Sequence, residues 1–198
     1  MSEDPQESLD LFDDHEEVVS EDGKKVTRKG IYLLPNLLTT ASLFSGFFSI
    51  ISAINGNFIA SGMALFAAQM LDGLDGRVAR LTNSQSLFGA QYDSLCDVIS
   101  FGLAPAIIVF LWGLDSMGQA GWVFSFLYVA AAALRLARFN TYIGSEDTYF
   151  KGLPSPVASG MVVYFVWAMS SYGIQGEEVG AILATFTAIL TGLVSLLM

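Results

Sequence analysis

Six apolar stretches separated by short polar breaks run from residue 33 to the end of the chain. Each is close to the roughly 20 residues that a helix needs to cross a bilayer. The breaks carry turn residues, such as Asn55-Gly56-Asn57 and Thr82-Asn83-Ser84. The pattern predicts membrane-spanning helices over about 33–54, 58–75, 88–112, 119–139, 153–171 and 178–197.

The composition supports this interpretation, because 53% of the 198 residues are hydrophobic and only 14% are charged. Nothing in the chain resembles a soluble second domain. We therefore expect an all-α integral membrane protein, with residues 33–198 forming one membrane domain of six transmembrane helices.

The basic residues predict the orientation. With six spans, every Lys and Arg falls on the side of the N-terminus, and the loops of the other side have none. Cytoplasmic loops are the ones enriched in Lys and Arg. The N-terminus is therefore expected in the cytoplasm and the protein in the cytoplasmic (inner) membrane. The clusters are Lys24, Lys25, Arg28 and Lys29; Arg77 and Arg80; Arg135 and Arg138; and Lys151.

The net charge of −10 arises mostly at the N-terminus, where residues 1–29 hold ten of the nineteen acids. Residues 1–22 are poor in apolar side chains and are expected to be a disordered, solvating tail. Basic and apolar residues mix over 23–32, which predicts an interfacial helix on the headgroups. The acidic start does not resemble a cleavable signal peptide. No nucleic-acid partner is expected.

Four aspartates occur where ionised groups are costly and usually functional, in the second and third apolar stretches. Asp72 and Asp75 are spaced i, i+3, and Asp93 and Asp97 are spaced i, i+4, so each pair lies on one face of its helix. Four converging carboxylates would repel one another unless hard divalent cations lay between them. We expect Mg²⁺ or Mn²⁺ and a metal-assisted reaction on a phosphate, on the cytoplasmic side. The single cysteine, Cys96, is expected to pack rather than react.

Several neighbours of the aspartates suit a phosphate ligand. Gly76 and Gly89 would let a bulky group approach the carboxylates, and Arg80 could hold a phosphate by two parallel hydrogen bonds. Neutral hydrogen bonds to a nucleotide could come from Asn36, Thr39 and Ser86, although such residues are more often caps or turns when isolated.

Together these residues form the pattern Asp72-x2-Asp75-Gly76-x2-Ala79-Arg80-x8-Gly89-x3-Asp93-x3-Asp97, which resembles the signature of the CDP-alcohol phosphotransferases. Eight fixed positions within 26 residues make a chance match improbable. The resemblance implies a membrane enzyme of phospholipid synthesis with two divalent metal ions. By position, Asp72, Asp75 and Asp93 would hold metal, and Asp97 would touch metal and act as general base. Residues Asp72, Gly76, Ala79 and Arg80 would line the CDP site, with Ser86 at the β-phosphate side.

Other segments resemble phosphatidylserine synthases: RKGIYLLPNLLT, SLCDVISFGLAPA, RLARFN (135–140) and KGLPSP (151–156). This resemblance implies CDP-diacylglycerol as donor and L-serine as acceptor. Arg135, Arg138, Asn140 and Lys151 are candidates for binding the serine carboxylate or the lipid phosphate. The arginines and Lys151 could instead be topology anchors.

The sequence leaves other acceptors and another class of function open. The acceptor could be glycerol 3-phosphate or inositol phosphate, as in phosphatidylglycerophosphate or phosphatidylinositol-phosphate synthases. A divalent-cation transporter would also use intramembrane carboxylates, but the glycine and arginine positions and the lack of an evident internal repeat argue against it. The family resemblance further implies a homodimer embedded in membrane lipids.

Overall fold

The computed structural model describes residues 20–21, 24–25, 33–82, 86–141, 152–174 and 179–198. The chain divides into two compact units, residues 1–31 and 32–198. In the first, strands β1 (Ser20–Glu21) and β2 (Lys24–Lys25) pair antiparallel. The two described residues of the segment 23–32 are thus extended rather than helical. The rest of the predicted interfacial helix, and residues 1–19 of the predicted tail, lie outside the described residues.

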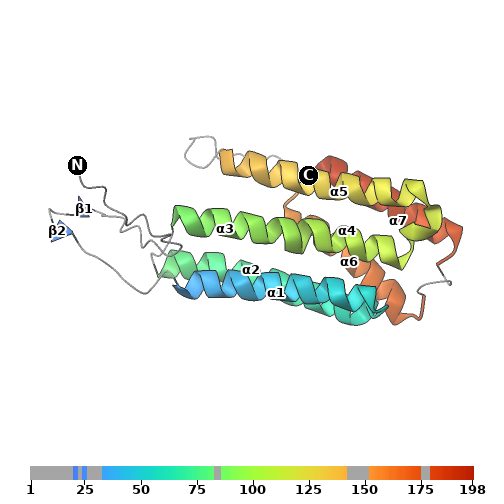
Figure 1. Cartoon of the computed structure of the whole chain (residues 1–198), viewed down its shortest axis with the longest axis horizontal. Coiled ribbons are helices and arrows are strands. Elements are labelled where there is room, and N and C mark those ends of the chain that lie inside the picture. The colour runs from blue at the N-terminus through green and yellow to red at the C-terminus, as the bar shows by residue number, and fades with distance from the viewer. Residues whose placement is uncertain (1–19, 22–23, 26–32, 83–85, 142–151, 175–178) are drawn as a thin grey trace, which may run out of the picture. The chain divides into compact units, whose positions relative to one another are not determined.

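The second unit is a bundle of long helices (Figure 1). Helices form where the apolar stretches predict them, and the predicted fold class is confirmed as all-helical for this unit. In chain order the elements are α1 (Leu33–Ile54), α2 (Phe58–Leu81), α3 (Leu87–Asp97), the π-helix η1 (Val98–Leu103), α4 (Ala104–Trp112), the 3₁₀ helix η2 (Leu114–Met117), α5 (Gln119–Thr141), α6 (Ser155–Ser171) and α7 (Ala181–Leu197).

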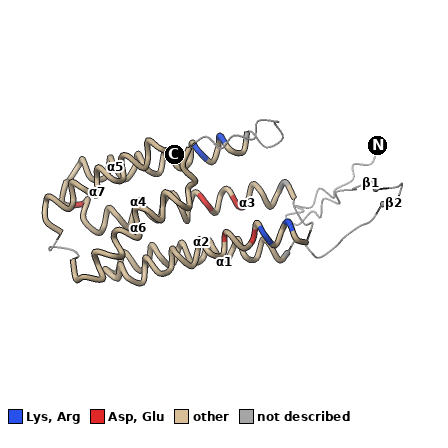
Figure 2. Tube along the Cα trace, turned by 180° about the vertical axis from the view of Figure 1, so that it is seen from behind, with Lys and Arg blue, Asp and Glu red and all other residues tan. Residues whose placement is uncertain are grey.

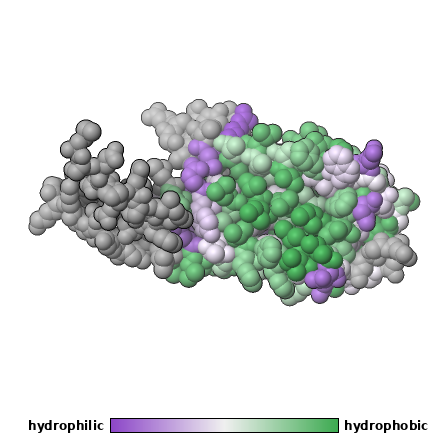
Figure 3. Space-filling model, in the orientation of Figure 1, coloured by the Kyte–Doolittle hydropathy of each residue, from purple (hydrophilic) through white to green (hydrophobic). Residues whose placement is uncertain are grey.

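Within the described residues, three helical segments are long and apolar enough to cross a membrane: Leu34–Ile54, Phe88–Trp112 and Gln119–Asn140. They coincide with three of the six predicted spans. Helices α6 and α7 have 17 residues each, about 25 Å at 1.5 Å per residue, which is shorter than a hydrocarbon core of about 30 Å. Figure 3 shows a broad apolar band between polar patches on the visible face of the bundle.

Helix α2 differs from its prediction in length. The apolar pattern predicts an end near residue 75, but the helix continues to Leu81, and the Thr82 amide donates to the carbonyl of Val78. No helix breaker occurs between Gly76 and Leu81, and polarity alone does not end a helix. The charged end of α2 therefore presents Asp72, Asp75 and Arg80 from one continuous helix.

The third predicted span is a single helical rod that contains a π-helical segment, η1, directly after Asp97. Neighbouring helices pack closely on it: a Cβ added at Gly102 would lie 3.3 Å from the Cβ of Ala132 on α5. The buried Tyr128 hydroxyl donates to the carbonyl of Phe101, at 3.2 Å. Short π segments inside α-helices are often found at functional sites, and this one directly follows Asp97.

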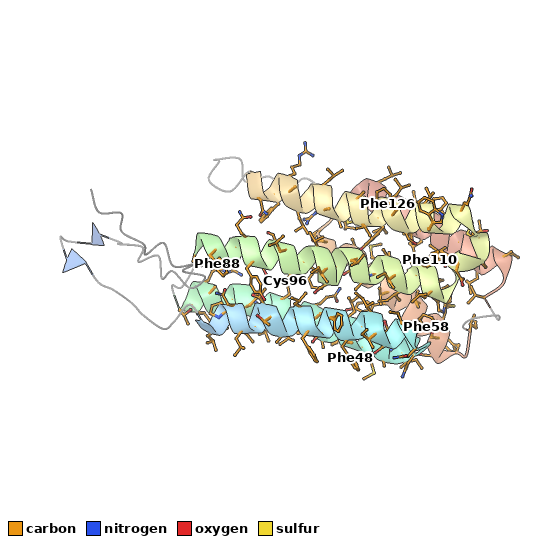
Figure 4. All side chains as sticks on the ribbon, in the orientation of Figure 1. Phe48, Phe58, Phe88, Cys96, Phe110 and Phe126 are labelled. Atoms are coloured by element: carbon orange, nitrogen blue, oxygen red, sulfur yellow. The ribbon has the colours of Figure 1, made fainter. Side chains whose placement is uncertain are left out.

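The core draws buried side chains from α1, α2 and η1 as well as from α4, α5, α6 and α7. Trp112 and Tyr128 are fully buried in it, and the Trp112 indole donates to the carbonyl of Ile174. Aromatic side chains also project outward from the bundle, including Phe48, Phe88 and Phe126 (Figure 4). Such exposed apolar side chains suit a lipid environment.

Candidate metal and substrate site

Three aspartates from two helices meet in the described part of the bundle. Asp72 and Asp75 come from α2 and Asp93 from α3, and one carboxylate oxygen of each lies within 4.8 Å of the others. The helical spacing predicts this convergence. Asp75 is the most buried of the three, at 5% exposed, and its Oδ2 accepts a hydrogen bond of 2.7 Å from the Thr39 hydroxyl on α1. Thr39 thus orients a carboxylate, rather than standing as an isolated cap.

Asp97 completes the group. It follows Asp93 by four residues on α3, and its carboxyl group lies beside that of Asp72, with which it interacts electrostatically. The structure thus brings Asp72, Asp75 and Asp93 together, with Asp97 next to Asp72.

The residues fit a divalent metal. Asp93 Oδ1 is buried and has no hydrogen-bond partner among the described residues. A buried carboxylate oxygen without a partner is costly unless a cation or a donor reaches it. Clustered carboxylate oxygens are the hard ligands that Mg²⁺ and Mn²⁺ prefer.

The predicted nucleotide side of the site lies along the end of α2. Gly76 is exposed, and a Cβ placed there would have no described atom within 4 Å, so space is open beside the aspartates. Ala79 is half-buried. Arg80 is exposed, and its Nε donates to the carbonyl of Gly76 at 3.0 Å, which keeps the guanidinium next to that open space.

Ser86 and Gly89, at the start of α3, have structural roles besides their predicted role in donor binding. Ser86 caps α3, because its hydroxyl accepts a hydrogen bond of 2.9 Å from the Gly89 amide. A Cβ added at Gly89 would lie 3.3 Å from Asn36 Oδ1 and 3.1 Å from the Ser86 hydroxyl. Asn36, Ser86 and Gly89, three of the eight residues predicted for donor binding, therefore lie together. Gly89 is needed for close packing here whether or not a ligand approaches it.

The acceptor candidates on α5 are placed differently from one another. Arg135 is half-buried, interacts electrostatically with Asp97, and donates through Nη1 to the Ser155 hydroxyl at 3.2 Å. Its Nε is buried with no partner among the described residues. Arg138 is exposed. Asn140 Oδ1 accepts from the Ser94 hydroxyl at 3.0 Å, which ties α5 to α3. Lys151 lies outside the described residues.

Charged residues gather at one half of the bundle. Figure 2 shows the arginines of α2 and α5 in the half that holds the aspartates of α2 and α3. Cys96 lies on α3 between Asp93 and Asp97 (Figure 4) and is buried, in agreement with a packing role.

Two contacts of this site were not predicted. Ser155, which holds Arg135, lies 20 residues away in the chain, and Ser94 binds Asn140 over a separation of 46 residues. Ser155 falls within KGLPSP, a segment that the sequence analysis singled out by its resemblance to phosphatidylserine synthases. That resemblance did not indicate that Ser155 would contact Arg135.

Comparisons with known proteins agree with this geometry. Residues 32–194 match the family described as CDP-alcohol phosphatidyltransferase. A Helicobacter pylori protein named CDP-diacylglycerol–serine O-phosphatidyltransferase is 45% identical over 143 residues, covering 72% of this chain and 60% of the relative. A Mycobacterium bovis protein of the same name is 36% identical over 159 residues, covering 76% of this chain and 55% of the relative.

A third similar protein is the archaetidylserine synthase of Methanothermobacter thermautotrophicus, 39% identical over 144 residues, which cover 72% of this chain and 60% of the relative. The alignments thus span little more than half the length of these curated relatives.

Proposed function

The chain belongs to the CDP-alcohol phosphatidyltransferase family, and from that premise we propose that it is a membrane-embedded phosphatidylserine synthase. It would transfer the phosphatidyl group of CDP-diacylglycerol to the hydroxyl of L-serine and release CMP. The observation that carries the proposal is the meeting of Asp72, Asp75 and Asp93 within 4.8 Å, with Asp97 beside Asp72. Serine as acceptor is supported by the names of the relatives, all of which include it.

In this mechanism Asp97 accepts the proton of the serine hydroxyl as the serine oxygen attacks the phosphorus that carries diacylglycerol. The new bond is serine O–P, and the bond that breaks joins that phosphorus to the oxygen bridging it to CMP. Asp72, Asp75 and Asp93 would hold two divalent ions, Mg²⁺ or Mn²⁺. Such ions, when bound, neutralise charge on a diphosphate and on the departing phosphate. Thr39 keeps the Asp75 carboxylate in place through its 2.7 Å hydrogen bond.

The donor would lie along the open side of α2. The space beside Gly76 admits a bulky group, and Arg80 at the helix end supplies a planar cation suited to phosphate. Asn36 and Ser86 converge beside Gly89 and offer amide and hydroxyl groups for the nucleotide or β-phosphate. Ala79, half-buried on the same helix, leaves room for the cytidine.

The acceptor would lie near Arg135, because this arginine interacts electrostatically with Asp97, the proposed base. Its Nε has no described partner although it is buried, and a carboxylate or phosphate there would satisfy it. Serine carboxylate and lipid phosphate share this chemistry, so kinetics must distinguish them. Arg138 and Asn140, further along α5, would contribute to the same region, and Lys151 is a further candidate on its sequence position alone.

The membrane topology follows from the same proposal. We place six spans in the cytoplasmic (inner) membrane, with the N-terminus and the aspartate site on the cytoplasmic side, because the described arginines of the bundle gather at that end. A homodimer is the expected assembly for this family.

An acceptor competition would test the proposed activity. Membranes containing the protein should incorporate labelled serine into a chloroform-soluble lipid when CDP-diacylglycerol and Mn²⁺ are supplied. Excess unlabelled serine should suppress the label, whereas excess glycerol 3-phosphate or inositol phosphate should not. Suppression by either phosphorylated acceptor, with formation of its own lipid product, would assign the chain a different acceptor.

A further inference from the structure

A glutamine in the apolar part of α2 has every polar atom of its side-chain amide engaged by α6. The Gln69 Nε2 donates to the carbonyl of Pro156 at 2.6 Å and to the Ser159 hydroxyl at 3.0 Å. Its Oε1 accepts a hydrogen bond from the Tyr164 hydroxyl. We call Gln69, Ser159 and Tyr164 the amide clamp.

The surface of α6 is shaped to receive this amide. A Cβ added at Gly160 would lie 3.3 Å from Gln69 Nε2 and 3.1 Å from the ring of Tyr164. A side chain at position 160 would require the glutamine or the tyrosine to shift by a few tenths of an ångström. The Ser159 hydroxyl also bonds the Pro156 carbonyl, at 2.8 Å, so donors and acceptors of the clamp satisfy one another, as buried polar groups in a membrane domain must.

The amide clamp lies next to the proposed metal site. Gln69 precedes Asp72 by three residues, less than one turn of α2 or about 4.5 Å along its axis. On the other side of the same turn, the Ser42 hydroxyl of α1 donates to the carbonyl of Ala68 at 2.9 Å. The turn before the first aspartate is therefore held from two directions.

The clamp also reaches the segment that holds Arg135. Pro156, whose carbonyl binds Gln69, is adjacent to Ser155, whose hydroxyl accepts from Arg135. One short piece of α6 thus contacts both the metal helix and the arginine near Asp97.

From this arrangement we infer that Gln69 is a positioning residue, whose amide clamp on α6 sets the rotation of α2 and so holds Asp72 in register with Asp93 and with the Arg135 region. The inference rests on the proposed function, because it assumes that the aspartates bind a divalent ion. A positioning role differs from a purely structural one in its effect on the metal. Loss of the amide clamp should weaken Mn²⁺ binding even in protein that remains folded. Residues that support metal ligands from outside the coordination shell typically change metal affinity by roughly 10- to 100-fold.

The test measures the Kd for Mn²⁺ of Gln69→Leu and of the wild-type protein. Binding is monitored by electron paramagnetic resonance in detergent, without substrates. The expected result is a Kd for Mn²⁺ raised about tenfold, the lower end of that range, because Gln69 acts through its helix and not on Asp72 directly. Thermal unfolding is recorded for each variant. The Mn²⁺ dependence of transfer should shift in parallel, while kcat at saturating Mn²⁺ changes little.

Ser49→Ala is the matched control. Ser49 is buried and its hydroxyl bonds the carbonyl of Ser61 at 2.7 Å, so this variant also removes a contact between α2 and a neighbouring helix. Ser61 lies eleven residues before Asp72, or about 16 Å along α2. Ser49→Ala should reduce thermal stability and leave the Kd for Mn²⁺ unchanged. Tyr164→Phe, a milder change that removes one hydrogen bond of the clamp, should raise the Kd by a smaller factor and covers the case in which Gln69→Leu does not fold.

Two results would overturn the inference alone: unchanged Mn²⁺ affinity in both clamp variants, or equal weakening in Ser49→Ala, which would indicate a general stability effect. Absence of Mn²⁺ binding by the folded wild-type protein would instead overturn the proposed metal site, and the inference with it.

Discussion

Replacing Asp97 by Asn separates the role of this residue from that of the other aspartates. The change preserves the size of the side chain but removes its charge and its ability to accept a proton. Asp72, Asp75 and Asp93, whose oxygens lie within 4.8 Å of one another, remain intact. We therefore expect CDP-diacylglycerol and Mn²⁺ still to bind while transfer is lost.

The magnitude follows from the chemistry assigned to the residue. Loss of a positioned general base lowers a rate by about 10² to 10⁴, which corresponds to roughly 2.7 to 5.4 kcal/mol of activation free energy. Asp72 lies beside Asp97, and its carboxylate can accept a hydrogen bond from the new amide, so the local fold should persist. A structural collapse is therefore not expected to explain the loss.

The assay measures transfer of phosphatidyl groups to labelled serine at saturating Mn²⁺, together with equilibrium binding of CDP-diacylglycerol to the same preparation. Asp97→Glu serves as the control, because it keeps a base but moves it by one methylene, and partial activity is expected. Turnover of Asp97→Asn within a few-fold of wild type would refute the assignment of Asp97 as base. Loss of donor binding as large as the loss of turnover would instead show that Asp97 acts chiefly as a ligand.

Three further predictions concern other parts of the chain. Asp72→Ala or Asp75→Ala should weaken metal and donor together, seen as a raised Mn²⁺ requirement in a transfer titration, and an unchanged requirement would remove the residue from the metal site. Deletion of residues 1–22 should leave activity in correctly inserted protein largely intact, since this acidic segment lies outside the matched family region; loss of activity with normal insertion would give it a role. Arg135→Gln should raise the KM for serine if the guanidinium binds the serine carboxylate, or the KM for CDP-diacylglycerol if it binds the lipid phosphate, by about tenfold or more. Arg135→Lys should recover only part of the loss, because it keeps the charge without the planar two-pronged geometry. Unchanged KM values with less inserted protein would make Arg135 a topology anchor.

The sequence predicts the convergence of Asp72, Asp75 and Asp93 because the rules that govern it are local. The spacings of Asp72 and Asp75, and of Asp93 and Asp97, fix which side chains share a face once the helices form. The apolar pattern then indicates which segments are helical, and the convergence within 4.8 Å follows from packing those two faces together.

Other features depend on contacts between distant residues, for which a single sequence contains no rule. The π segment Val98–Leu103 has an ordinary apolar sequence, and its geometry depends on neighbours such as Ala132 and Tyr128. In the sequence, Gln69 is a single polar residue in an apolar stretch. Its hydrogen-bond partners lie 87 to 95 positions further along the chain, so the sequence does not indicate them. Ser86 illustrates the opposite case, since the cap that it forms is a local role that its residue type allows.

The proposed metal-dependent transfer to serine is tested most directly by a stoichiometric assay. The purified protein is placed in vesicles that contain CDP-diacylglycerol, and labelled serine and Mn²⁺ are added. CMP and phosphatidylserine should appear in a 1:1 ratio, a chelator that removes divalent ions should stop the formation of both, and Asp97→Asn should form neither at an appreciable rate. Release of CMP without a serine-labelled lipid, or synthesis of phosphatidylserine that persists in the chelator or in the variant, would contradict the proposed transfer.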